Sequence, residues 1–114
     1  MKETIGIKLT ELASPHVSFF FSEAQTEEYP YAVYTSSVTP VYTKDGIHHY
    51  ESSVVITVYA NDLEVVNPIA DNILDAIKNG MNNGQYASRQ VSDNTDCTEE
   101  VWSREMSLTI KQYR

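Results

Sequence analysis

The chain has 114 residues, of which 41% are hydrophobic, and its formal net charge is −8. This length and composition predict a single domain, residues 1–114, with one hydrophobic core. The 8 basic residues are not grouped along one face, as a nucleic-acid-binding surface would require. We therefore expect no sequence-specific binding of nucleic acid. No apolar run approaches the roughly 18 to 20 residues of a membrane span, and no signal-peptide layout opens the chain, so we expect a cytoplasmic protein without a membrane partner.

The first predicted element is a short amphipathic helix over residues 3–13, which ends at Ser14-Pro15. Its apolar residues recur at helical spacing: Ile5, Leu9 and Leu12. Residues 17–21 follow as a brief apolar and aromatic run, which predicts a buried strand.

Two long strands come next, over residues 30–43 and 47–60, and Asp45-Gly46 between them is a strong hairpin signal. Pro40 interrupts the first strand, which predicts an edge position or a bulge there. The second strand alternates, so one of its faces is expected to point to the core. That face holds Tyr50, Ser52, Val54, Ile56, Val58 and Ala60.

A second helix is predicted over residues 62–80, capped by Asn61-Asp62 and ended by Asn79-Gly80. Asn67-Pro68 is a second start signal, so either residues 62–66 form a separate turn or the helix is kinked at Pro68. The stripe that should face the core comprises Leu63, Val66, Ala70, Ile73, Leu74 and Ile77.

The remainder predicts a polar strand over residues 85–93, a polar loop over 94–99 and a closing strand over 100–112. Arg104 falls on the apolar face of the closing strand, and we place it at the rim. These elements predict an α+β fold, with an antiparallel-dominated sheet under one main helix and the short N-terminal helix. The expected core includes Val54, Ile56, Val58, Ile73, Leu74, Ile77, Leu108 and Ile110.

The sequence contains none of the common catalytic or ligand-binding motifs considered: no Gly-rich phosphate loop, no G-x-S-x-G and no H-E-x-x-H. Cys97 is alone, which favours an inert or loop cysteine over a nucleophile or a metal ligand. His48 and His49 are neighbours in a strand and point to opposite faces, so they cannot grip one metal ion, and both are expected at the surface. We therefore expect no enzyme, no metal and no cofactor.

Two features bear on partners. The eight tyrosines fit either an interaction surface or plain strand propensity, and the sequence leaves the two open. The hairpin over residues 38–50 has a polar tip and is longer than a core of this size needs, so it is either a docking arm or an ordinary exposed hairpin. Its candidate interface residues are Tyr42, Lys44, Asp45, His48, His49 and Tyr50.

Residues 28–34 read E-Y-P-Y-A-V-Y, which resembles the P-Y-x-x-Y segment of bacteriophage and prophage tail-completion proteins. This family of tail terminators, or U-like minor tail proteins, joins heads to tails in long-tailed phages. The similarity continues through residues 54–60, the helix over 67–77 and the closing strand over 106–113. As a pattern it covers residues 3–113, and in wording it covers residues 28–77.

The resemblance implies a ring, typically a hexamer, that caps the tail tube and joins it to the head. Its partners would be further copies of the chain, the tail tube and neck proteins. The protein would then occupy the bacterial cytoplasm during assembly and the virion tail afterwards, without catalysis or cofactor. The alternative is a small non-enzymatic domain that binds a peptide or protein partner on a similar fold. A small enzyme on a ferredoxin-like sheet is a third class.

Overall fold

The computed structural model describes residues 2–13, 15, 17–21, 29–44, 46–82 and 86–113. The elements in chain order are α1 (Lys2–Ala13), β1 (Ser18–Phe21), β2 (Tyr31–Thr43), β3 (Gly46–Ala60), α2 (Leu63–Gly80), β4 (Tyr86–Thr98) and β5 (Val101–Tyr113). The five strands form one sheet in the order β1-β2-β3-β5-β4. Only β1 and β2 are parallel, and the other neighbours are antiparallel. The predicted α+β fold is therefore confirmed.

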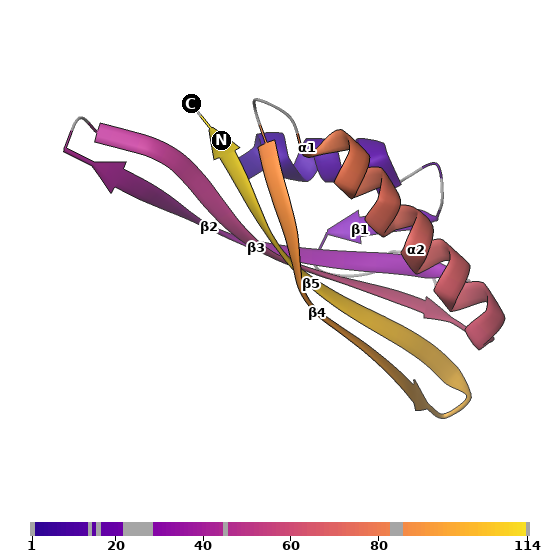
Figure 1. Cartoon of the computed structure of the whole chain (residues 1–114). Coiled ribbons are helices and arrows are strands. Elements are labelled where there is room, and N and C mark those ends of the chain that lie inside the picture. The colour runs from indigo at the N-terminus through magenta and orange to yellow at the C-terminus, as the bar shows by residue number, and fades with distance from the viewer. Residues whose placement is uncertain are drawn as a thin grey trace.

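Helix α2 lies along one face of the sheet, as Figure 1 shows. It begins where the Asp62 carboxylate accepts a hydrogen bond of 2.9 Å from the backbone N–H of Glu64, because the first turn of a helix leaves such donors unpaired. Its buried residues keep the predicted spacing: Val66, Ala70, Ile73 and Ile77. Of these, Ala70, Ile73 and Ile77 belong to one core cluster with Val54, Ile56 and Val58 of the sheet.

Helix α1 packs against the C-terminal end of α2 (Figure 1). The contact is close at Gly80, where an added Cβ would lie 2.6 Å from Cδ2 of Leu12, so the absence of a side chain at Gly80 allows the approach. Leu9 and Ala13 are buried in the same core.

The predicted core is buried with one exception. Leu74 is only half-buried, because it packs on the margin of the core and lines a groove beside α2. One of the two alternatives for the start of α2 is wrong. Residues 62–66 do not form a separate turn, since one helix runs from Leu63 to Gly80 with Pro68 inside it.

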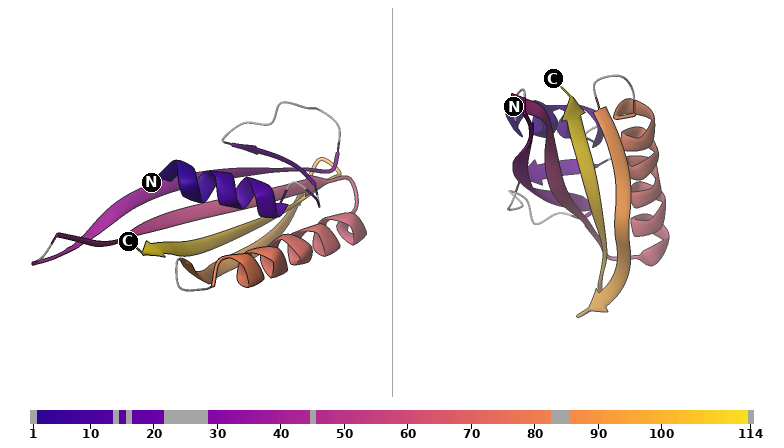
Figure 2. Two further views of the ribbon diagram at one scale, coloured as in Figure 1. Left: turned by 90° about the horizontal axis from the view of Figure 1, so that it is seen from above. Right: turned by 60° about the vertical axis from the view of Figure 1, so that its left-hand side comes forward.

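The molecule is elongated, with principal extents of 52 × 23 × 22 Å, because two hairpins run past the helices at opposite ends of the sheet. One is the β2–β3 hairpin, in which the register shifts between Val41 and Tyr42, close to the bulge predicted at Pro40. The other is the β4–β5 hairpin. Figure 2 shows the hairpins from two further sides, with the β2–β3 hairpin in purple and the β4–β5 hairpin in orange and yellow.

The polar loop predicted over residues 94–99 is wrong. Strand β4 continues to Thr98 and pairs there with Val101, and the turn consists of Glu99 and Glu100 alone. Both glutamates have positive φ, 52° and 68°, as a two-residue hairpin turn of the I′ type requires. Pairing with β5 holds this polar stretch as a strand although all ten residues from 91 to 100 are exposed.

The packing predicts a large loss of stability on truncating Ile73, a fully buried residue of α2 in the core. Ile73→Ala should lower the free energy of unfolding by about 2–5 kcal/mol, through lost transfer energy and the cavity left behind. Val65→Ala on the same helix is the matched control, since Val65 is 39% exposed and should change stability by less than about 1 kcal/mol. Urea unfolding measures both, and equal effects would contradict the core assignment.

Candidate interaction surfaces

The predicted interface residues lie at or near the tip of the β2–β3 hairpin, and the structure separates them by exposure. Tyr42 is 67% exposed and Lys44 is exposed in the turn. Tyr50 is half-buried, on the helix-covered side of the sheet. Asp45 and the side chain of His48 lie outside the described residues.

His49 is not at the surface, which corrects the sequence prediction. Only 8% of it is exposed, because it is flanked on the sheet by Val41 of β2 and by Tyr113 of β5. Its Nε2 lies 3.3 Å from Oε1 of Glu51, and the ring centroids of His49 and Tyr113 are 5.8 Å apart. His49 therefore belongs to the packing of the hairpin base.

Arg104 of β5 joins the body of the protein to the β4–β5 hairpin. Its Nε and Nη2 donate to the two carboxylate oxygens of Asp93 on β4, at 2.9 and 2.6 Å. Its Nη1 donates to Oδ1 of Asp71 on α2 at 2.8 Å, and to the backbone carbonyl of Asn67 at 3.5 Å. The side chain of Arg104 is 13% exposed, and no pattern in the sequence indicated its pairing with α2 and β4.

The pairing changes the acidity of both partners. Hydrogen bonds from Arg104 lower the pKa of the Asp93 carboxyl, although partial burial acts in the opposite direction. The same contacts, first with Asp93 and then with Asp71, raise the pKa of the Arg104 guanidinium. A bidentate arginine–carboxylate contact of this kind fixes the relative orientation of the two side chains and also stabilises their pairing.

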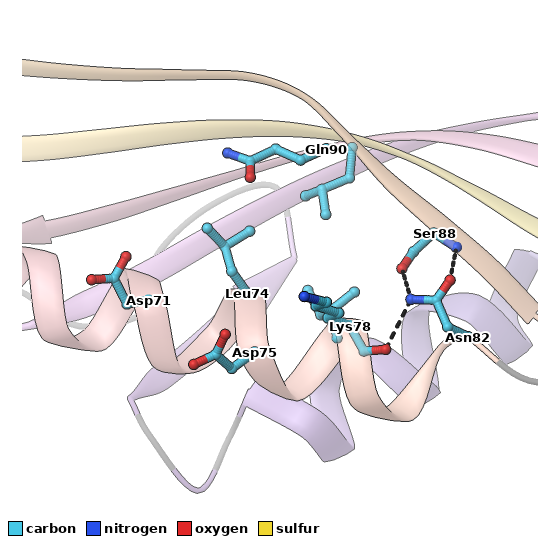
Figure 3. Close-up of a pocket in the computed structure, with 9 residues that line it drawn as sticks. Asp71, Leu74, Asp75, Lys78, Asn82, Ser88 and Gln90 are labelled. Carbon is cyan, nitrogen blue, oxygen red and sulfur yellow. Dashed lines mark hydrogen bonds between the residues drawn. The ribbon is translucent and has the colours of Figure 1, made fainter.

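A groove of about 740 Å³ separates α2 from β4. Figure 3 shows Asp71, Leu74 and Asp75 on the helix side and Gln90 on the strand side. Its apolar lining is Leu74, Ile77 and Leu108.

Asn82 joins the two walls of the groove just past the C-terminal end of α2. Its side-chain N–H groups donate to the carbonyl of Lys78 and to Oγ of Ser88, each at 2.8 Å. Its Oδ1 accepts from the Ser88 backbone N–H at 2.9 Å. Figure 3 shows Asn82 bridging the helix and the strand at one end of the groove. Asp71, another residue of the lining, accepts a hydrogen bond from Arg104.

The sheet face opposite the helices carries a tyrosine cluster. The rings of Tyr29 and Tyr31 stack with centroids 5.3 Å apart, and Tyr31 lies 5.2 Å from Tyr59 of β3. Burial, followed by the neighbouring phenol groups, raises the pKa of Tyr31. Tyr34 is instead buried beneath Phe19 in the core, so the tyrosines serve both packing and surface.

Cys97 is exposed on β4, so it is a strand residue rather than the predicted loop residue. Among the described residues, no group of three or more His, Cys, Asp or Glu is placed to hold a metal ion. No helix in the described part of the chain combines the length and apolar character that a bilayer crossing needs.

The comparison with solved structures finds the same fold in a viral-type particle. A chain of the virion of a native gene transfer agent particle matches with a TM-score of 0.59 and 12% sequence identity. The match covers 93% of this chain and 84% of that chain. No protein-family model matches the sequence, and no curated protein matches it. The similarity therefore establishes a shared fold over nearly the whole chain.

The Arg104 pairing predicts a loss of stability when the guanidinium is removed. Arg104→Met should lower the free energy of unfolding by about 1–3 kcal/mol, because the side chain of Asp93, which is 29% exposed, loses its charged hydrogen bonds. Arg89→Met removes an exposed arginine of β4 and is the control, with an expected change within about 0.5 kcal/mol. Equal losses in urea unfolding would show that the pairing is energetically neutral.

The lowered pKa of Asp93 also predicts a pH dependence. The stability that Asp93 contributes is present above its ordinary pKa of 3.8 and is lost as the pH falls through the lower folded-state value. The stability difference between the wild type and Asp93→Asn should therefore shrink from about pH 5 to pH 2. Urea unfolding at several pH values measures this difference. A difference that stays constant over the range would contradict the pairing.

Proposed function

We propose that this chain is a structural tail-completion protein of a phage or prophage, which forms a ring that caps the tail tube and joins it to the head. The observation that carries the proposal is the fold shared with a chain of a gene transfer agent virion. The resemblance of residues 28–34, 54–60 and 67–77 to tail-completion proteins supports the same assignment.

The shape of the molecule fits a role in assembly. Hairpins extend past the helices at both ends of the sheet, so a single subunit can reach neighbours on two sides (Figure 1). At the β2–β3 end, Tyr42 and Lys44 are exposed and can contact a neighbouring subunit or the tail tube. We assign the docking role to the tip of this hairpin and a packing role to His49 at its base.

A second candidate function rests on the groove beside α2. A cleft of about 740 Å³ with apolar and acidic walls could hold a peptide segment of another protein. Such a binding domain would remain a monomer until its partner is added, whereas a ring former self-associates. The mass of the purified protein in solution therefore separates the two functions.

The docking role of the β2–β3 hairpin is tested by shortening it. Replacing residues 42–48 with Asn-Gly joins Val41 to His49, which already face each other across the hairpin, through a favoured two-residue turn and removes the tip. We expect the subunit to fold with wild-type circular dichroism and to lose ring formation, measured by native mass spectrometry and by tail joining in the phage.

The control places the same Asn-Gly turn in the opposite hairpin, in place of Glu99-Glu100. This exchange removes no paired residue, because Thr98 and Val101 still face each other. It should leave ring formation intact. If the shortened β2–β3 hairpin also assembles and joins tails normally, the hairpin has no docking role.

A further inference from the structure

The β2–β3 hairpin carries an exposed aromatic side chain near its tip. Tyr42 is 67% exposed, more than any other large hydrophobic residue in the described part of the chain. Lys44 is exposed in the turn that follows. The hairpin projects past the helices, so this end of the molecule is open to a neighbour (Figure 1). Tyrosine is among the residues that most often supply the main binding energy of an interface, which makes Tyr42 a suitable anchor.

The groove between α2 and β4 is a preformed recess. Its apolar lining is Leu74, Ile77 and Leu108. Asn82 joins the two walls at one end, through its bonds to the carbonyl of Lys78 and to Ser88, so the width of the groove is set within the subunit. Figure 3 shows Gln90 on the strand side, above the helix. The volume of about 740 Å³ is ample for a large side chain of a partner.

The groove offers one anion and one cation to a partner. Asp71 is already paired with Arg104. Asp75 and Lys78 also line the groove, and both are exposed. Neither forms an ion pair with any residue that the structure describes. A partner that fits this groove therefore combines an apolar group with charges of both signs.

The hairpin tip contains the matching groups. Lys44 is cationic, forms no ion pair with the described residues, and precedes an anionic residue in the sequence, Asp45. Together with the ring of Tyr42, these residues supply the apolar group, the cation and the anion that the groove can receive. Complementary charges across an interface select the partner and its orientation.

The tip and the groove of one copy are too far apart to meet. Three strand spacings, about 14 Å, separate β2 from β4 in the sheet. In addition, Gln90 of the groove is level with Ser36, whereas Tyr42 lies six residues further along β2. Each copy thus has a tip to insert and, on a separate part of its surface, a groove to receive one. Such a head-to-tail contact generates a ring when its rotation closes.

We propose that Tyr42 and Lys44 of one copy dock in the groove between α2 and β4 of the next copy. The ring of Tyr42 packs on Leu74, its hydroxyl meets the side chain of Gln90, and Lys44 pairs with Asp75. This inference rests on the proposed ring, since it names the surface that receives the hairpin tip. The occupant of the groove is then a second copy of this chain, and not a peptide of another protein.

Exchanging the charges of the proposed ion pair tests the contact in the full chain. Lys44→Asp or Asp75→Lys alone places like charges together and should raise the dissociation constant of assembly by about tenfold or more, measured by sedimentation velocity. The two substitutions combined restore the attraction and should recover most of the lost affinity. Glu105→Lys makes the same charge change at an exposed position of β5 outside the groove, so it is the matched control and should assemble normally.

Truncation of the anchor tests the apolar part of the contact. Tyr42→Ala should weaken assembly by about tenfold or more, with wild-type circular dichroism, because the ring supplies most of the buried area of the tip. Val91→Ala is the control, since Val91 is 58% exposed on β4 and does not line the groove. It should leave the dissociation constant unchanged.

The outcomes separate the contact from the ring itself. An assembled wild type that is weakened by the hairpin substitutions but unaffected by Asp75→Lys would overturn the groove contact and leave the ring intact. A combined variant that assembles no better than either single variant would overturn the contact as well. A wild type that stays monomeric at every concentration would overturn both the contact and the proposed ring.

Lysine labelling tests the same contact in the wild type, without substitutions. Acetylation of Lys44 in the tip and of Lys78 in the groove should be several-fold slower in assembled protein than in subunits diluted until they separate. Lys111 is the internal control, because its half-exposed side chain lies outside both surfaces and should react equally in the two states. Equal rates for Lys44 or for Lys78 in the two states would overturn the proposal even if every variant misfolded.

Discussion

The uninterrupted antiparallel pairing of β3 with β5 is the constraint on which the rest of the molecule depends. It runs from His49↔Tyr113 to Ala60↔Trp102, and β2 and β4 are added on its two sides. The helices cover only part of this length, so the strands must protrude. The two protruding hairpin ends are thus consequences of one long strand pair under a shorter helical layer.

Arg104 connects the covered and uncovered parts of the sheet. It stands on the helix-facing side of β5, in line with Met106, Leu108 and Ile110, and it donates hydrogen bonds to both α2 and β4. A charge in such a place is tolerated because its donors meet two carboxylates, and the arrangement fixes how the β4–β5 hairpin leaves the body. The same arginine therefore pairs with Asp71, which lines the groove, and with Asp93 of the β4–β5 hairpin.

The sequence predicted those elements that bury one face. Helix α2 and strands β3 and β5 follow their apolar periodicity, so their faces and most of the core were predicted correctly. The outer half of β4 could not be predicted, since it buries neither face and Glu99-Glu100 is not a usual turn signal. The pairing of Arg104 was equally hidden, because Asp71 lies 33 residues away in the chain.

The candidate surfaces divide in the same way. The polar hairpin tip was visible in the sequence, whereas the burial of His49 depends on Tyr113 and Val41 from neighbouring strands. Local sequence patterns predicted the individual strands and helices. The contacts between residues far apart in the chain follow only from the pairing of the strands.

The proposed role in completing phage tails is tested most directly by removing the gene from the phage or prophage that encodes this chain. Electron microscopy of the lysate should then show filled heads and separate tails without joined particles, and expression of the wild-type chain in trans should restore joining. Joined, infectious particles in normal numbers without the gene would contradict the account.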